Sequence, residues 1–171
     1  MTRLQYCLNA STIRPTPLLE KVRIAADTGY AAIELWHDEI EQYVAAGGTL
    51  NDLKKHVVDS GLSIPTTIYL ADWFDADAES YPQILDACKR RMQDAATLGA
   101  RYVIASPPAA DADYDLGAAR YRELLEAGDS IGVQPAMEFL GFVGQLNTIE
   151  DAVDVMQRSG RPDATTILDP F

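Results

Sequence analysis

Two carboxylates stand at the ends of short apolar runs, and they are the residues of this sequence best suited to chemistry. Glu138 follows the run 135–137, and Asp169 follows the run 165–168 about thirty residues later. Each run has the composition of a buried parallel strand. If the two strands are neighbours, their axes lie roughly 4.8 Å apart and both carboxylates emerge at the same end of the sheet. A structural alternative is that Glu138 caps a turn and Asp169 begins a loop.

Paired carboxylate oxygens predict a divalent metal ion. Hard oxygen donors favour Mn²⁺ or Mg²⁺, with Co²⁺ and Zn²⁺ as alternatives. The carboxyl ends of parallel strands are also where α/β sheets and barrels bind their ligands. The sequence therefore predicts a metal site that involves Glu138 and Asp169.

Composition excludes several other classes of protein. The chain has 171 residues, is 47% hydrophobic and carries a net charge of -12 with a pI near 4.4. Such a charge opposes binding to nucleic acid or to anionic membranes. The sequence has no apolar run of membrane-spanning length and no leader pattern, so we expect a cytoplasmic protein. Cys7 and Cys88 are expected to be small core residues, because two cysteines form no disulfide framework.

The elements that must position these carboxylates repeat along the chain. Strand-like runs begin near Leu4, Ala31, Ile64, Arg101, Val133 and Ala164. They recur roughly every 30 residues, the length of one βα unit. Between them lie amphipathic helices with Thr16, Thr49 and Thr148 as expected caps and glycines at their ends. Strict alternation of this kind predicts a parallel sheet covered by helices.

A doubly wound sheet and a (βα) TIM barrel both fit this alternation. The barrel is favoured because polar residues end most strands and because no strand is followed by the glycine-rich turn of a dinucleotide site. A closed barrel of this kind has eight strands, whereas the sequence supplies about six. We therefore expect residues 1–171 to form a single, incomplete TIM-barrel domain that ends after strand six.

The sequence resembles the xylose isomerase-like TIM-barrel superfamily, which includes sugar phosphate isomerases and epimerases. The resemblance is carried by Asn9 at the end of the first strand and by "GYAAIELW" at 29–36, "LGARYVIASPP" at 98–108, "MEFLG" at 137–141 and "LDPF" at 168–171. The last two motifs are the more specific. In that family a glutamate after strand five and an aspartate after strand six bind a divalent metal, and Glu138 and Asp169 match them.

The resemblance implies a metal-dependent isomerase or epimerase that acts on a sugar or keto-sugar. Glu138 would move a proton next to a carbonyl through an enediolate, and Asp169 would only bind the metal. The family's remaining metal ligands, a histidine and a second glutamate, lie on strands seven and eight. We therefore expect this chain alone to bind metal weakly and to turn over little or no substrate.

Other residues are candidates for substrate binding. They are Asn9, Glu34, Trp36, His37 and Tyr69. Glu34 alternates with apolar neighbours and would face away from the helices, where it either holds a hydroxyl or pairs with a buried base. His37 is more often a solvated loop residue, and His56 is expected on the surface. Tyr69 and Trp73 could stack on a sugar ring or simply pack, and the acidic loop 72–79 is expected to be a solvated segment.

The expected partner is a small sugar or keto-sugar, and we expect a homo-oligomer. Lysine and arginine do not cluster, which favours a free sugar over a sugar phosphate. Two alternatives remain at this point: an inosose-type dehydratase, which begins with the same proton abstraction, and a non-catalytic α/β fragment or interaction module whose open strand edges pair with another chain.

Overall fold

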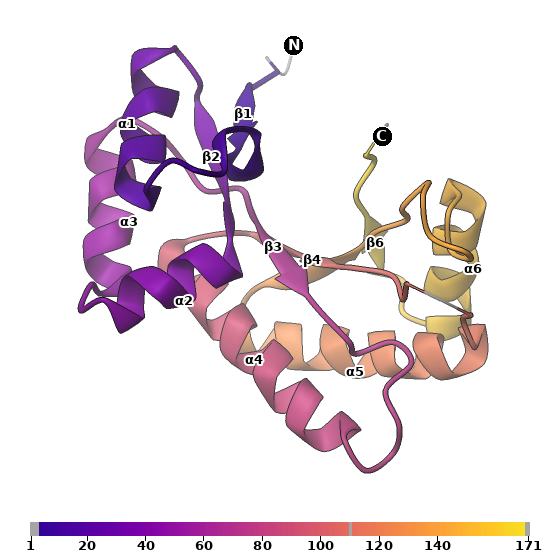
Figure 1. Cartoon of the computed structure of the whole chain (residues 1–171). Helices are drawn as coiled ribbons and strands as arrows, with labels where there is room; N and C mark the ends of the chain where they lie inside the picture. The colour runs from indigo at the N-terminus through magenta and orange to yellow at the C-terminus, as the bar shows by residue number, and fades with distance from the viewer. Residues whose placement is uncertain (1–3, 110, 170–171) are drawn as a thin grey trace. The chain divides into compact units, whose positions relative to one another are not determined.

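A computed structural model describes residues 4–109 and 111–169 of the chain. The described residues form parallel strands that alternate with helices (Figure 1). The strands are β1 (Cys7–Asn9), β2 (Ala32–Trp36), β3 (Thr66–Leu70), β4 (Tyr102–Ala105), β5 (Gln134–Met137) and β6 (Thr165–Thr166). Hydrogen-bonded neighbours follow the chain order from β1 to β6. This is the α/β architecture of six successive βα units of a TIM barrel, as predicted.

The helices are bounded largely by the caps and glycines expected from the sequence. They are η1 (Ala10–Ile13, a 3₁₀ turn), α1 (Leu18–Asp27), α2 (His37–Ala45), α3 (Leu50–Asp59), α4 (Tyr81–Leu98), α5 (Tyr114–Ile131) and α6 (Ile149–Ser159). Thr148 forms a full capping box with Asp151, and Thr49 accepts a hydrogen bond from the Asp52 backbone. The expected cap at Thr16 is wrong, because Pro17 is the N-cap of α1 and makes no side-chain bond.

The chain divides into two compact units. Unit 1 comprises residues up to Ile68 together with Asp94–Arg101, and unit 2 comprises Tyr69–Gln93 and the residues from Tyr102 onward. The boundary therefore runs through β3 and α4. Within unit 1 the backbone of Arg101 bonds to Pro65, 3.2 Å apart, and within unit 2 the backbone of Ser106 bonds to Leu70, 3.3 Å apart.

Unit 1 packs α1, α2 and α3 beside the first two strands (Figure 1). In β2 the side chains of Ile33 and Leu35 are fully buried, whereas those of Glu34 and Trp36 are half-buried. This alternation puts the apolar residues on the helix side and leaves the polar residues on the other face. Its buried core includes Val22 of α1 and Leu53 of α3.

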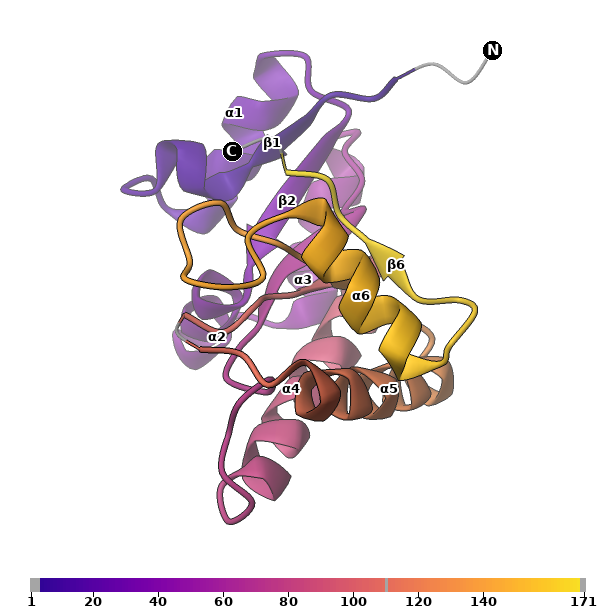
Figure 2. The same cartoon turned by 90° about the vertical axis from the view of Figure 1, so that its right-hand side faces the viewer.

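Unit 2 packs α5 against α6 and against β5 (Figure 2). Gly128 of α5 lies so close to the following strand that an added Cβ would approach the Val133 carbonyl to 2.4 Å. Tyr121 of α5 is fully buried, and its hydroxyl lies 3.0 Å from the Pro135 carbonyl and 2.9 Å from the Thr165 carbonyl. One helix side chain thus ties β5 to β6, the two strands that precede the paired carboxylates.

Two features differ from the expectations. Helix α2 follows β2 without a loop, whereas the sequence predicted a loop there. Cys7 is exposed and not a core residue, while Cys88 is buried as expected, and burial raises the pKa of the Cys88 thiol to about 11. Within the described ranges, no helix combines the length and hydrophobicity needed to span a bilayer.

Candidate active site

Glu138 is the first residue after β5, and its carboxylate is buried, with 8% of the residue exposed. Its backbone N–H donates to the Ala105 carbonyl of β4 at 3.0 Å, which fixes it at the carboxyl edge of the strand. The Ser106 hydroxyl donates a hydrogen bond of 3.0 Å to Glu138 Oε2. A buried carboxylate at this edge has the placement expected of a ligand-binding group.

Asp169 lies three residues beyond β6 and is half-buried. Strand β6 pairs with β5 through Met137 and Thr166, and the Ile167 backbone donates to the Met137 carbonyl at 3.0 Å. These bonds bring the segment that carries Asp169 alongside the end of β5. Pro170 and Phe171 of the "LDPF" motif lie outside the described residues.

The two carboxylates interact electrostatically. Burial raises the pKa of the Glu138 carboxyl above its ordinary value, the hydrogen bond from Ser106 acts in the opposite direction, and the charge of Asp169 raises it further. Like charges brought together in a partly buried place repel, and a cation between them would remove that repulsion. No ion pair among the described residues involves either carboxylate.

The donor set fits a hard divalent cation only in part. Two carboxylate oxygens suit Mg²⁺ or Mn²⁺, and Mg²⁺ in proteins is bound by one or two carboxylates together with waters and substrate. Among the described residues, no three His, Cys, Asp or Glu side chains lie together in the arrangement that would enclose a metal ion. Glu138 and Asp169 could therefore hold one side of a cation, with the other positions filled by other oxygen or nitrogen donors.

A second polar cluster lies in unit 1. Asn9 and Glu34 are opposite each other in the pairing of β1 with β2, and Asn9 Nδ2 donates to Glu34 Oε2 at 2.9 Å. Asn9 Oδ1 accepts from the Trp36 indole at 3.0 Å and from the Ser11 backbone at 2.9 Å. The Arg14 guanidinium lies 4.9 Å from the centre of the Trp36 ring. Three of the predicted substrate-binding residues therefore form one hydrogen-bonded group.

His37 is not a solvated loop residue. It is the first residue of α2, is 1% exposed, and shares a hydrogen bond of 3.0 Å between its Nε2 and Thr67 Oγ1 of β3. The structure therefore makes it a buried partner of the sheet, which corrects the expectation of a solvated position. His56 of α3 is exposed, as expected.

The loop after β3 is only partly solvated. Its acidic side chains are exposed, but Trp73 and Phe74 are buried, with ring centres 5.2 Å apart. Of the two possibilities for Trp73, the structure shows packing, because the ring is fully buried, while Tyr69 is a half-buried residue of β3. Buried Arg120 of α5 donates to the carbonyls of Trp73 at 3.3 Å, Phe74 at 2.9 Å and Ala76.

Sequence reasoning missed three residues that hold these groups in place. Ser106, Tyr121 and Arg120 are not among the residues that the sequence predicts for the site. Ser106 could have been found from its place directly after a strand, since it follows the predicted strand as Glu138 follows the next one. The sequence carries no comparable indication for Tyr121 and Arg120, whose partners are backbone carbonyls.

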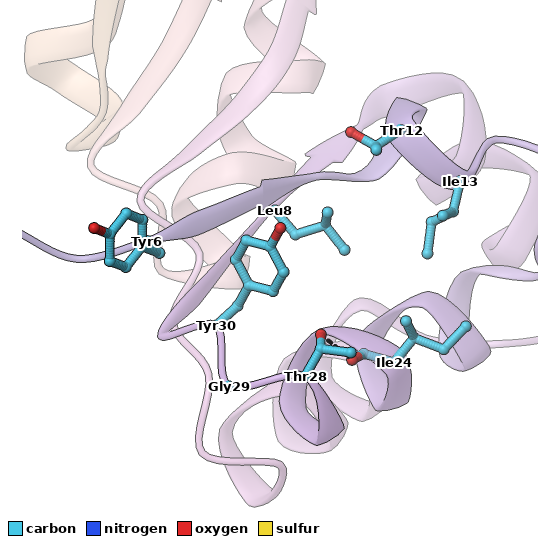
Figure 3. A pocket seen from close by; sticks show the side chains of 8 residues that line it. All are labelled: Tyr6, Leu8, Thr12, Ile13, Ile24, Thr28, Gly29 and Tyr30. Carbon is cyan, nitrogen blue, oxygen red and sulfur yellow. Dashed lines mark hydrogen bonds between the residues drawn. The ribbon is translucent and has the colours of Figure 1, made fainter.

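A pocket of about 490 Å³ lies elsewhere in unit 1, between β1, η1 and α1 (Figure 3). The side chains of Leu8, Ile13 and Ile24 line it together with those of Tyr6 and Tyr30. None of the predicted substrate-binding residues lines this pocket. Its lining is mainly apolar and includes no carboxylate, histidine or lysine.

The family model for the xylose isomerase-like TIM barrel matches residues 22–171. The chain belongs to this family. The predicted resemblance and fold class are thereby confirmed, and solved structures agree with them. The chain superposes on the IOLI protein with a bound zinc atom at a TM-score of 0.86 and 23% identity, over 97% of this chain and 63% of that one. It superposes on D-psicose 3-epimerase in the presence of D-fructose at a TM-score of 0.79 and 16% identity, over 95% of this chain and 62% of that one.

Two enzymes are related to this xylose isomerase-like chain by sequence. The inosose isomerase of Bacillus velezensis is 25% identical over 98% of this chain, and the 3-dehydroshikimate dehydratase of Pseudomonas aeruginosa is 28% identical over 90% of it. The chain spans 63% of the first relative and 24% of the second. These relatives support an enzyme of this superfamily.

Proposed function

We propose that the chain carries part of the active site of a divalent-metal-dependent sugar or keto-sugar isomerase or epimerase. The observation that carries the proposal is the buried carboxylate of Glu138 at the carboxyl edge of β5, with the charge of Asp169 beside it. The substrate class is taken from the inosose isomerase relative and from the structural similarity to D-psicose 3-epimerase.

Glu138 is the proposed proton carrier. Its carboxylate removes the proton from the carbon next to the substrate carbonyl, and the electron pair of that C–H bond forms an enediolate. Returning the proton from Glu138 to the neighbouring carbon gives isomerisation, and delivery of a proton from a second carboxylic acid on the opposite face, with Glu138 keeping the proton it removed, gives epimerisation. A bound divalent cation supplies Lewis-acid polarisation of the substrate oxygens. Asp169 is proposed only to help hold that cation.

Burial suits Glu138 to this role. A raised carboxyl pKa brings the group closer to neutral pH, where one side chain can both accept and return a proton. Asn9, Glu34, Trp36, His37 and Tyr69 remain proposed substrate contacts. Within unit 1, Glu34 and Asn9 present hydrogen-bonding groups of the kind that bind sugar hydroxyls.

The test is calorimetric titration of Mn²⁺ into the wild-type chain and into Glu138→Gln and Asp169→Asn. We expect weak binding to the wild type, no measurable binding to Glu138→Gln and reduced binding to Asp169→Asn. Glu126→Gln, on the exposed surface of α5, is the matched control and should bind like the wild type. A wild-type chain that does not bind Mn²⁺, or a Glu138→Gln variant that binds equally, contradicts the proposal.

A dehydratase is the second candidate, favoured by the similarity to 3-dehydroshikimate dehydratase. It would begin with the same proton abstraction, but the electron pair would then expel a hydroxyl group from the next carbon. Proton NMR in D₂O with a panel of ketoses and inososes distinguishes the two. Deuterium at the carbon next to the carbonyl without loss of water indicates isomerisation or epimerisation, whereas an unsaturated product indicates dehydration.

A further inference from the structure

Ser106 is held in one place by its surroundings. It directly follows β4, and its backbone N–H donates to the Leu70 carbonyl of β3 at 3.3 Å. The next two residues, Pro107 and Pro108, have fixed φ angles, and a following proline restricts Ser106 itself to extended backbone conformations. The hydroxyl therefore projects from a backbone that has little freedom to move.

The pairing of β4 with β5 places this hydroxyl beside Glu138. Ala105 is opposite Met137 in the parallel register, so Ser106 and Glu138 follow as the next pair along the two strands. Residues opposite each other in a parallel pair project to the same face of the sheet. The 3.0 Å bond from the Ser106 hydroxyl to Glu138 Oε2 is the direct result of this register.

The bond makes the two carboxylate oxygens of Glu138 unequal. Oε2 accepts from Ser106, whereas no hydrogen bond within the described part of the chain reaches Oε1. The hydroxyl also restrains rotation of the carboxylate about its terminal bond. Oε1 is consequently the oxygen available for a cation.

We propose that Ser106 is a positioning residue that holds Glu138 so that only Oε1 binds the divalent cation. This inference rests on the proposed function. Ser106 is not a nucleophile in this arrangement, because its hydroxyl donates to a carboxylate. Removing a group that orients a metal ligand typically weakens metal binding by about 10- to 100-fold.

The test compares Mn²⁺ affinity, measured from the electron paramagnetic resonance signal of free Mn²⁺, in four forms of the 171-residue chain. Ser106→Ala should bind about tenfold more weakly than the wild type. Ser106→Thr keeps the hydroxyl and should restore the affinity to within about threefold. Ser130→Ala is the matched control, since the Ser130 hydroxyl donates only to the Glu126 carbonyl on α5, and its affinity should not change.

Carboxylate infrared bands give a second reading of the same variants. In the Mn²⁺-minus-apo difference spectrum, the bands that Asp169→Asn keeps and Glu138→Gln abolishes are assigned to Glu138. They should show the wide splitting of single-oxygen binding in the wild type and a narrower splitting in Ser106→Ala. Equal affinity and equal splitting in both forms overturn the role of Ser106 and leave the metal proposal standing. A wild-type chain without Mn²⁺ binding overturns both.

Discussion

The two units use the same local arrangement at the carboxyl edges of their strands, but they surround it differently. In unit 1, Asn9 of β1 donates to Glu34 at the position opposite it on β2, and in unit 2, Ser106 donates to Glu138 at the position opposite it after β5. In unit 1, Asn9 Oδ1 accepts hydrogen bonds from two neutral groups, the Trp36 indole and the Ser11 backbone. The glutamate of unit 2 has a second carboxylate as its other neighbour.

These different surroundings predict a structural role for Glu34 and a metal-binding role for Glu138. A glutamate that accepts from an amide fixed by neutral groups stabilises the structure around it. A buried glutamate next to another carboxylate carries unbalanced charge, which is costly unless a cation or a proton is bound. The proposed metal site therefore belongs to unit 2, whereas four of the proposed sugar contacts, Asn9, Glu34, Trp36 and His37, belong to unit 1.

The largest expected effect contrasts the two glutamates directly. Glu138→Gln should weaken Mn²⁺ binding by at least about 30-fold, because a neutral amide replaces a charged ligand. Glu34→Gln should leave the Mn²⁺ affinity within about twofold of the wild type. Calorimetric titration of both variants checks this, and equal losses would remove the distinction between the two units.

The next effect concerns the hydrogen bonds around Asn9 in unit 1. Asn9→Ala should lower the free energy of unfolding by about 2 kcal/mol, because it removes the cap of η1 and leaves the Trp36 indole without its acceptor. Mn²⁺ affinity should not change. Urea unfolding measures the loss, with exposed Asn51→Ala on α3 as the control. A loss of Mn²⁺ binding in Asn9→Ala would mean that the network contributes to the metal site.

A smaller loss of stability is expected when His37 loses its hydrogen-bond partner Thr67. Thr67→Val keeps the shape of a fully buried side chain but removes the hydroxyl that bonds to His37 Nε2. The free energy of unfolding should fall by about 1 kcal/mol, the typical effect of losing one buried hydrogen bond. Exposed Thr12→Val on η1 is the control. An unchanged stability would show that His37 is satisfied without Thr67.

The smallest expected effect is a pH dependence. The pKa of the Glu138 carboxyl is raised above its ordinary value of 4.5 in the folded chain, so folding favours the protonated form. The stability that this group contributes is fully present below pH 4.5 and is lost as pH rises through the raised pKa. In EDTA, the wild type should therefore lose stability relative to Glu138→Gln as pH increases from 4.5 upward. A difference that stays constant with pH contradicts the burial of a charged carboxylate.

The strands and most helices could be predicted because their signals are local. Each predicted strand start lies close to an observed strand, and Thr49, Thr148 and the glycines at the helix ends mark most of the helix boundaries. Helix α2 was missed because it begins directly after β2, with Trp36 as an N-cap that makes no side-chain bond. Asp38 and Glu39 in its first turn are a helix-start signal, but this signal is weak without a polar cap or a preceding loop.

The site could be predicted only residue by residue. Asn9, Glu34 and Trp36 were identified separately, but their common hydrogen bonds depend on the register of β1 with β2. The burial of His37 depends on Thr67, thirty residues away. Trp73 and Phe74 are buried within a loop whose other residues are largely acidic. These are tertiary contacts, which composition and periodicity do not encode.

The hydrogen bonds from Arg120 to the loop after β3 affect which amino-acid substitutions this loop can tolerate during evolution. The guanidinium contacts carbonyl oxygens at Trp73, Phe74 and Ala76, and every amino acid supplies a carbonyl oxygen. The exposed residue Asp75 can thus be replaced without altering the path of the backbone, whereas the Asp77 carboxylate is needed to accept from the backbone N–H groups of Glu79 and Ser80. Mutations can therefore change exposed side chains of this loop at the carboxyl edge of the sheet while the loop keeps its backbone conformation.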